Sequence, residues 1–359
     1  MNPIRVMIVE DSRVVREHLE HVVRCDPRLD VAASYETAEA ALAGLARVRP
    51  DVISMDIRLP GMNGFCATQR IMSEQPTPIV VVSASVECGE LKISMNALQA
   101  GALAVVEKPA GTSHKDYQRL ANRLCDQFVL MSQVKVVRQR FNSGVRARPG
   151  DGPLFPCTAS RLARPRGAFQ IAGIVASTGG PGALARLAGG LPADFPVPIV
   201  LVQHITSSFH AGFVSWLDGI CGLSVVTAED GRQPLAGFLY VAPADKHLSV
   251  DRGTLRICDD GPVCGQAPSG TVLFGSLAAS YGSEAVGILL TGMGQDGAEG
   301  LKSLREAGGY TLAEDESTAV VYGMPAAAAR MGAVCESLPL DAIGRRLRCL
   351  VGAAEEAGR

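Results

Sequence analysis

The sequence of 359 residues lacks several features that would place it in a specialised class. Aromatic residues make up only 5% of it, and the ten cysteines are scattered without a CxxC pair. Charged residues nearly balance, leaving a formal net charge of −2. No apolar run approaches the roughly 20 residues that a membrane-spanning helix requires. These absences argue against a disulfide framework, a general attraction to nucleic acid and insertion into a membrane.

The N-terminal residues MNPIRVMIVED contain an apolar run too short for a secretory signal, and acidic residues follow it directly. We therefore expect a cytoplasmic protein with reduced cysteines. A hydrophobic content of 47% supplies ample core material. Because a chain of this length exceeds one ordinary core, two domains are expected.

Residues 1–131 alternate short β-branched runs with amphipathic segments such as Arg13–Arg24, which has its apolar residues on one face. The expected strands are Arg5–Val9, Val31–Ser34, Asp51–Met55, Pro78–Val82 and Leu103–Val106. Five such strand–helix units predict a doubly wound parallel sheet, whose ligands bind at the carboxyl ends of the strands.

Polar residues follow four of these strands: Glu10, Asp11, Asp56, Ser83 and Lys108. Each of them alone is an ordinary polar strand end, but five on successive strands are hard to attribute to coincidence. Three carboxylates on one edge repel each other unless a cation joins them, and an open site with oxygen ligands suits Mg²⁺. A hydroxyl and an ammonium nearby would hold the remaining oxygens of a phosphoryl group on Asp56.

This part of the chain resembles the response-regulator receiver family over its whole length. The matching stretches are VEDS at 9–12, MDIRLPGMNG at 55–64, VVSA at 81–84 and EKP at 107–109. The resemblance implies a flavodoxin-like (βα)5 fold in which Asp56 takes a phosphoryl group from a histidine kinase. It also implies that Glu10, Asp11, Asp56 and the carbonyl of Arg58 bind Mg²⁺ and that Ser83 and Lys108 sense the phosphate.

The chain departs from the receiver pattern at one position. Receivers usually carry an aromatic residue three positions before the lysine, where this chain has Val105. Without an aromatic residue there, the usual coupling of phosphorylation to an aromatic rotamer is not expected. Phosphorylation of Asp56 itself is still expected.

Composition changes over residues 132–169. Between Gln133 and Arg166 there are eight Lys or Arg residues against one acid, Asp151, together with four prolines. This composition predicts a mobile linker. Because aromatic residues are not interleaved with the basic ones, nucleic-acid binding is not expected, and docking onto an acidic surface of either domain remains an alternative.

The stretch Ile171–Leu184, IAGIVASTGGPGAL, predicts a buried strand, a tight glycine turn and a helix. Ser177 lies at the carboxyl end of that strand, beside the unpaired amides that open the helix. Such amides can face a developing negative charge, which favours a nucleophile. An ordinary helix cap explains the serine equally well, so this stretch alone leaves both readings open.

Two further polar residues come from the same part of the chain. His204 is the only one of the six histidines that ends a predicted buried strand, Ile199–Gln203. Asp296 lies in the glycine loop 291–297 after the predicted strand Ala285–Leu290. A serine needs a base to take its proton, and the imidazole needs an orienting carboxylate, so these residues form a candidate triad. The chain has no G-x-S-x-G elbow.

The same loop supports a rival interpretation. Gly292, Gly294 and Gly297 match G-x-G-x-x-G between a strand and a helix, and Glu314 follows at the next strand end. This is the fingerprint of a dinucleotide site. It does not open the domain, however, and it leaves Ser177 and His204 unexplained. No lysine follows either glycine turn, which disfavours a Walker-type phosphate loop.

Residues 170–355 are similar to the chemotaxis protein-glutamate methylesterase family, and the order receiver, linker and hydrolase matches the whole chain. The matching stretches are ASTGGPGAL at 176–184, QH at 203–204, LTGMGQDGAEGL at 290–301 and EDESTAVVYGMP at 314–325. The resemblance implies a mainly parallel, doubly wound α/β domain with Ser177 as nucleophile, His204 as base then acid and Asp296 as its orienter. It assigns the oxyanion hole to the amides of Thr178 and Met293.

The family hydrolyses γ-glutamyl methyl esters on chemoreceptors, some members deamidate glutamine, and the ester reaction needs no cofactor. The resemblance thus implies a phosphorylation-regulated enzyme whose partners are a methylated chemoreceptor and a histidine kinase. Where the family commonly has HRPS, this chain has QAPS at 266–269. With this departure the chemistry is expected to survive, while two alternatives stay open: a different receptor partner, or service to a non-flagellar array. A separate rival keeps the fold but loses the enzyme and is a catalytically weak, phosphorylation-regulated adaptor that only grips the receptor.

Overall fold

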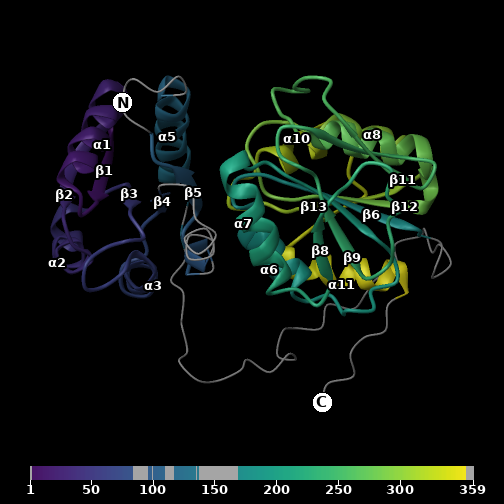
Figure 1. Cartoon of the computed structure of the whole chain (residues 1–359), viewed down its shortest axis with the longest axis horizontal. Coiled ribbons are helices and arrows are strands. Elements are labelled where there is room, and N and C mark those ends of the chain that lie inside the picture. The colour runs from purple at the N-terminus through teal and green to yellow at the C-terminus, as the bar shows by residue number, and fades with distance from the viewer. Residues whose placement is uncertain are drawn as a thin grey trace, which may run out of the picture. The chain divides into compact units, whose positions relative to one another are not determined.

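A computed structural model describes residues 2–83, 96–98, 100–109, 117–134, 136 and 169–352 (Figure 1). The chain divides into two compact units, the first carrying β1 to α5 and the second carrying β6 to α11. Nearly all of the predicted linker, 132–169, lies outside the described residues, so the predicted domain boundaries remain predictions. Within the described residues, no helix has both the length and the apolar character needed to span a membrane.

The first unit contains a five-stranded parallel sheet in the order β2-β1-β3-β4-β5. Its strands are β1 (Ile4–Val9), β2 (Leu29–Tyr35), β3 (Val52–Met55), β4 (Ile79–Ser83) and β5 (Ala104–Glu107). Its described helices are α1 (Arg13–Cys25), α2 (Ala38–Val48), α3 (Gly64–Glu74) and α5 (Tyr117–Ser132). This strand order is that of flavodoxin-like folds, so the predicted fold class is confirmed.

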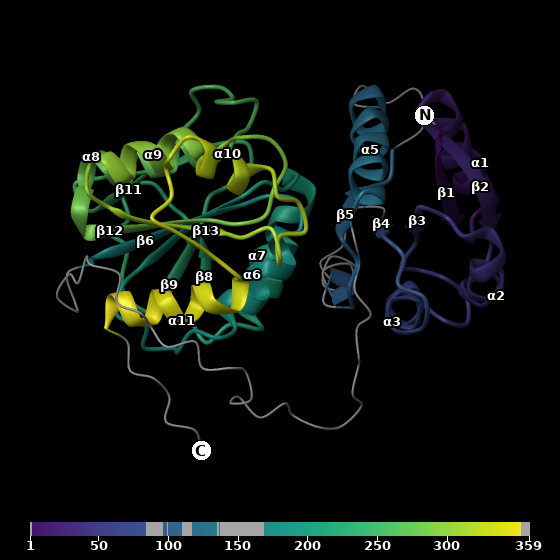
Figure 2. The same cartoon turned by 180° about the vertical axis from the view of Figure 1, so that it is seen from behind.

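Helices α1 and α2 show how the sequence determines which face of a helix is buried and where a helix begins. Leu19, Val22 and Val23 of α1 are buried, as the spacing of its apolar residues predicts. Thr37 caps α2 by accepting a hydrogen bond from the Ala40 amide. Helix α1 packs beside α5, and α2 packs beside α3 (Figures 1 and 2).

The second unit contains a seven-stranded parallel sheet in the order β14-β13-β12-β6-β7-β9-β8 among its described residues. Its strands are β6 (Ile171–Ala176), β7 (Ile199–Gln203), β8 (Ser224–Thr227), β9 (Phe238–Val241), β12 (Ala285–Leu289), β13 (Tyr310–Glu314) and β14 (Glu336–Leu338). The antiparallel hairpin of β10 (His247–Asp251) and β11 (Thr254–Cys258) stands apart from this sheet.

Helices cover both faces of this sheet. They are α6 (Gly180–Ala188), α7 (Ser207–Asp218), α8 (Gly270–Ser280), α9 (Ala298–Glu306), α10 (Met324–Arg330) and α11 (Leu340–Val351). Figure 2 shows α8, α9 and α10 on one face and α6 and α11 on the other. The predicted doubly wound α/β architecture is therefore confirmed.

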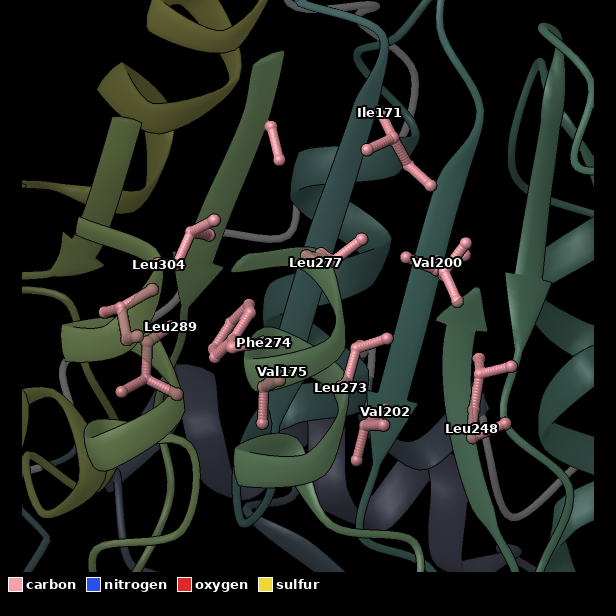
Figure 3. Packing of buried hydrophobic residues seen from close by; sticks show 14 of the residues in the cluster. Ile171, Val175, Val200, Val202, Leu248, Leu273, Phe274, Leu277, Leu289 and Leu304 are labelled. Atoms are coloured by element: carbon pink, nitrogen blue, oxygen red, sulfur yellow. The ribbon is translucent and has the colours of Figure 1, made fainter. Parts of the chain in front are cut away.

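Buried apolar side chains of α8 and of the sheet pack together in the core (Figure 3), and two glycines in the strands make room for them. A Cβ atom at Gly173 would lie 2.5 Å from Leu277, and one at Gly287 would lie 2.7 Å from Leu301. Glycine at these positions lets α8 and α9 approach the sheet closely. Phe274 and Leu277 of α8 fill the space above β6, and both are fully buried.

Candidate functional site

The carboxyl edge of the first sheet holds the acidic cluster that the sequence predicts. Glu10 and Asp11 follow β1, Asp56 follows β3, and ligand oxygens of all three lie within 4.8 Å of one another. Glu10 and Asp56 are buried, whereas Asp11 is exposed. Three carboxylate donors at a partly open edge fit a hard divalent cation such as Mg²⁺.

Lys108 neutralises part of this charge. Its Nζ atom lies 2.9 Å from Oδ2 of Asp56 and 2.7 Å from Oε2 of Glu10. Burial alone would lower the pKa of Lys108, but the two carboxylates raise it above its ordinary value. Burial and then the charge of Asp56 raise the pKa of Glu10. The ammonium is therefore held where it can contact a group attached to Asp56.

Ser83 and Arg58 also lie at this edge. Ser83 ends β4 and is buried, and its carbonyl accepts a hydrogen bond of 2.9 Å from the Lys108 amide. The Arg58 amide donates to Oδ1 of Asp56 at 3.4 Å. All six residues predicted for this site from the sequence therefore gather at one edge of the sheet.

Ser177 follows β6 directly, and the structure separates it from the helix that comes next. Helix α6 begins at Gly180, and its N-cap is Gly179, whose φ of +79° suits glycine. The capping interpretation of Ser177 is therefore wrong. The Ser177 amide donates to the carbonyl of Thr291 at 3.0 Å, which fixes the backbone of the turn. The side chain of Ser177 is half-buried and does not cap the helix, so the nucleophile interpretation remains.

His204 lies beside Ser177 because β6 and β7 are paired in parallel. Ala176 is the register partner of Gln203, and the His204 amide donates to the Ala176 carbonyl at 3.0 Å. The imidazole Nε2 atom lies 2.9 Å from Oδ2 of Asp296. The other ring nitrogen, Nδ1, is buried and has no hydrogen-bond partner among the residues that the structure describes.

Asp296 is buried beneath the N-terminus of α8 and accepts hydrogen bonds on both oxygens. Oδ2 accepts from His204 and from the Gly270 amide at 2.6 Å. Oδ1 accepts from Oγ of Ser269 at 2.6 Å and from the Thr271 amide at 3.2 Å. Burial alone would raise the pKa of Asp296, but these hydrogen bonds lower it to about 2. The carboxylate therefore stays charged wherever a histidine titrates.

This low pKa predicts a stability difference in acid. A carboxyl whose pKa is depressed by folding stabilises the protein above its unfolded pKa of 3.8, and this contribution is lost as the pH falls through about 2. Between pH 5 and pH 2 the free energy of unfolding should fall by about 2 kcal/mol more in the wild type than in Asp296→Asn. Urea unfolding monitored through the single tryptophan, Trp216, measures this in the second unit. Equal pH dependences would contradict the assignment.

The loop after β12 lies against the nucleophile turn. A Cβ atom at Gly292 would lie 2.7 Å from Cβ of Ser177, so only glycine permits this approach. The Met293 side chain is 57% exposed beside it. Within the described part of the chain, the amides of Thr178 and Met293 make no hydrogen bond. Both amides are therefore available to a ligand at this edge.

Sequence reasoning missed several residues of this site. Ser269 contacts Asp296, and Nε2 of Gln203 donates to the carbonyls of Ser177 at 2.9 Å and His204 at 3.1 Å. A signal for Gln203 was present in the pair QH at the strand end. No spacing rule connects Ser269 with a residue 27 positions later.

Two other residues bear on alternatives to this site. His210, which lies on α7 near His204, is half-buried and its Nε2 bonds the Ala242 carbonyl at 2.8 Å. The dinucleotide reading requires Glu314 to face a ligand. Glu314 is instead fully buried and accepts a hydrogen bond of 2.9 Å from the Thr291 amide.

The fold and these two sites define a class of protein: a receiver-like unit joined to an α/β unit with serine, histidine and aspartate at one sheet edge. The profile of the response regulator receiver domain matches residues 6–115, and that of the CheB methylesterase family matches residues 172–347. The chain therefore belongs to the CheB methylesterase family, which confirms the resemblance inferred from its motifs.

Relatives match the chain over nearly its whole length. Protein-glutamate methylesterase/protein-glutamine glutaminase 2 of Paramagnetospirillum magneticum is 54% identical over 98% of this chain and 99% of its own. The protein-glutamate methylesterase/protein-glutamine glutaminase of Nitrosospira multiformis is 44% identical over 97% of each chain. The solved catalytic domain of Thermotoga maritima CheB methylesterase aligns with 50% of this chain and 97% of its own, at 35% identity and a TM-score of 0.48.

Proposed function

We propose that the chain is a phosphorylation-regulated protein-glutamate methylesterase that hydrolyses glutamyl methyl esters on chemoreceptors through Ser177, His204 and Asp296. The names and full-length identity of its relatives support this activity. The observation that carries the residue assignment is the imidazole of His204, which follows β7 next to the end of β6 where Ser177 lies. Its Nε2 is bonded to Asp296 at 2.9 Å, and its Nδ1 is buried without a hydrogen-bond partner among the described residues.

In the proposed acylation step, Ser177 Oγ attacks the ester carbonyl carbon and Nδ1 of His204 takes its proton. The negative charge that forms on the carbonyl oxygen is bound by the amides of Thr178 and Met293. The bond to the methoxy oxygen then breaks, and His204 returns the proton so that methanol leaves. Asp296 stays ionised throughout and stabilises the imidazolium.

Deacylation repeats these roles with water as the nucleophile. His204 takes a proton from the water, whose oxygen attacks the acyl carbon, and then returns a proton to Ser177. The products are a glutamate side chain and free enzyme. The same steps deamidate glutamine when ammonia replaces methanol as the leaving group, an activity that the relatives' names include.

The first unit is proposed to receive a phosphoryl group on Asp56 from a histidine kinase. Glu10, Asp11, Asp56 and the carbonyl of Arg58 would hold Mg²⁺, which neutralises charge between carboxylates and phosphate. Lys108 and Ser83 would bind the other phosphoryl oxygens, and Lys108 already lies 2.9 Å from Asp56. Residues 1–131 would thus regulate residues 170–355 through the segment 132–169, in the cytoplasm where the kinase acts.

Removing the acceptor carboxylate should abolish phosphorylation. Wild type treated with acetyl phosphate and Mg²⁺ is expected to gain the mass of one phosphoryl group, and EDTA should prevent this gain because the carboxylates then repel the donor. Asp56→Asn should gain nothing and should lose stimulation of the esterase. Asp30→Asn, which changes an exposed carboxylate on β2, is the control. An equal mass gain in Asp56→Asn would refute the assignment.

Labelling with diisopropyl fluorophosphate tests the proposed nucleophile and separates an enzyme from a receptor-binding adaptor. The reagent should modify Ser177 alone, with loss of fluoride, and should inactivate the protein in proportion to labelling. Modification at another serine, or labelling of Ser177 without loss of turnover, would contradict the proposed mechanism.

A further inference from the structure

Thr291 connects the two segments that carry the proposed oxyanion hole. It lies just after β12, is fully buried and precedes Met293 by two residues. The mechanism assigns no step to it. Its backbone and its hydroxyl nevertheless bond three other segments of the second unit, at residues 177–178, 314 and 321.

The first connections run to the nucleophile turn. The Ser177 amide donates to the Thr291 carbonyl at 3.0 Å. The Thr291 hydroxyl donates to the carbonyl of Thr178 at 2.9 Å. One buried residue thus holds both the nucleophile and the residue that supplies the first oxyanion amide.

The remaining connections fix Thr291 itself. Its amide donates to Oε2 of the fully buried Glu314 at 2.9 Å. Its hydroxyl accepts from the Val321 amide at 2.8 Å, so the oxygen both donates and accepts. The next residue, Gly292, donates to the Val321 carbonyl at 3.0 Å and accepts from the Met324 amide at 2.8 Å. The backbone that leads into Met293 therefore has little freedom.

We propose that Thr291 is a positioning residue that aligns the Thr178 and Met293 amides on a single oxyanion; this inference rests on the proposed function. An oxyanion hole works only when both donors lie about 2.7–3.1 Å from the developing charge. The two amides come from segments more than a hundred residues apart, and the Thr291 hydroxyl bonds one segment while its backbone continues into the other. Without the Thr291 hydroxyl, the distance between the two amides would no longer be fixed, and they would not both lie within reach of one oxyanion.

Valine is the matched substitution because it keeps the shape of threonine and removes only the hydroxyl. Thr291→Val is expected to lower kcat about 100-fold, the cost of a misplacement near 1 Å, while KM changes little. The rate at which diisopropyl fluorophosphate phosphorylates Ser177, with loss of fluoride, should fall in parallel, because that reaction also places an oxygen in the hole. Thr291→Ser keeps the hydroxyl and should recover most of the lost rate.

Thr311→Val is the control, because Thr311 is equally buried, lies on the adjacent strand β13 and bonds the Cys335 amide at 3.0 Å. It should lose stability comparably and keep its kcat. Full activity in Thr291→Val beside an active wild type would overturn the inference, as would equal losses of kcat in Thr291→Val and Thr291→Ser. An inactive wild type would instead refute the proposed function, so the two failures are distinguishable.

Discussion

Replacing Ser177 by alanine is expected to lower kcat for ester hydrolysis by about 10⁶-fold, the loss seen when a nucleophile of this class is removed. The methyl group cannot form the acyl-enzyme, and any residual reaction depends on the oxyanion amides acting on water. The fold should be unaffected, since the hydrogen bonds that Ser177 makes with the described residues involve its backbone: its amide donates to Thr291 and its carbonyl accepts from Gln203.

The rates are best compared on a methylated receptor fragment, with product methanol assayed in single-turnover and steady-state conditions. Ser303→Ala, which changes an exposed serine on α9, serves as the control and should retain the wild-type rate. If Ser177→Ala kept more than a hundredth of the wild-type kcat, another group would have to be the nucleophile.

The second large effect is expected at Asp296, where asparagine should lower kcat by about 10⁴-fold. An amide NH₂ facing His204 would require an unprotonated Nε2 atom, which places the proton on Nδ1. That nitrogen could then no longer accept the serine proton. The opposite amide orientation would turn the NH₂ group toward the Thr271 amide, a donor that cannot accept a hydrogen bond.

Asp341→Asn is the matched control, because Asp341 is an exposed carboxylate paired with Arg186 at 2.7 Å on α11. It should leave kcat unchanged. Comparable activity in Asp296→Asn and Asp341→Asn would show that His204 needs no charged partner and would exclude the proposed triad.

Periodicity and chain order predicted most of the fold. Buried β-branched runs such as Ile171–Ala176 and Ile199–Gln203 identified the central strands, because strands buried on both faces are continuously apolar. Strands β8, β9 and β14 were not among the predicted strands, because each of them has only three or four residues, too few for a period to show.

The candidate triad was predictable because parallel strands carry their end residues to one edge. The residues that hydrogen-bond Asp296 could not be predicted in the same way. Ser269, Gly270 and Thr271 reach Asp296 only because α8 packs its N-terminus beneath the loop after β12, and no local pattern encodes that packing. Tertiary contacts of this kind depend on how helices lie across the sheet, which sequence spacing does not specify.

The same hydrogen bonds show which of the residues QAPS at 266–269 supports the proposed triad. Within residues 266–269, Ser269 holds Asp296, and it is one of the two positions, with Pro268, where the chain agrees with the common family pattern. Gln266 pairs with Val263 through its backbone. The serine that supports the proposed triad is retained, whereas the altered positions lie outside the hydrogen bonds to Asp296.

The central claim is that the chain releases methanol from glutamyl methyl esters through Ser177, under control of Asp56. The most direct measurement is methanol release from methylated receptor membranes by wild type and Ser177→Ala, with and without acetyl phosphate and Mg²⁺. We expect release by the wild type only, and faster release with the phosphodonor. Equal release by Ser177→Ala, or none from a folded wild type that binds the receptor, would contradict the account.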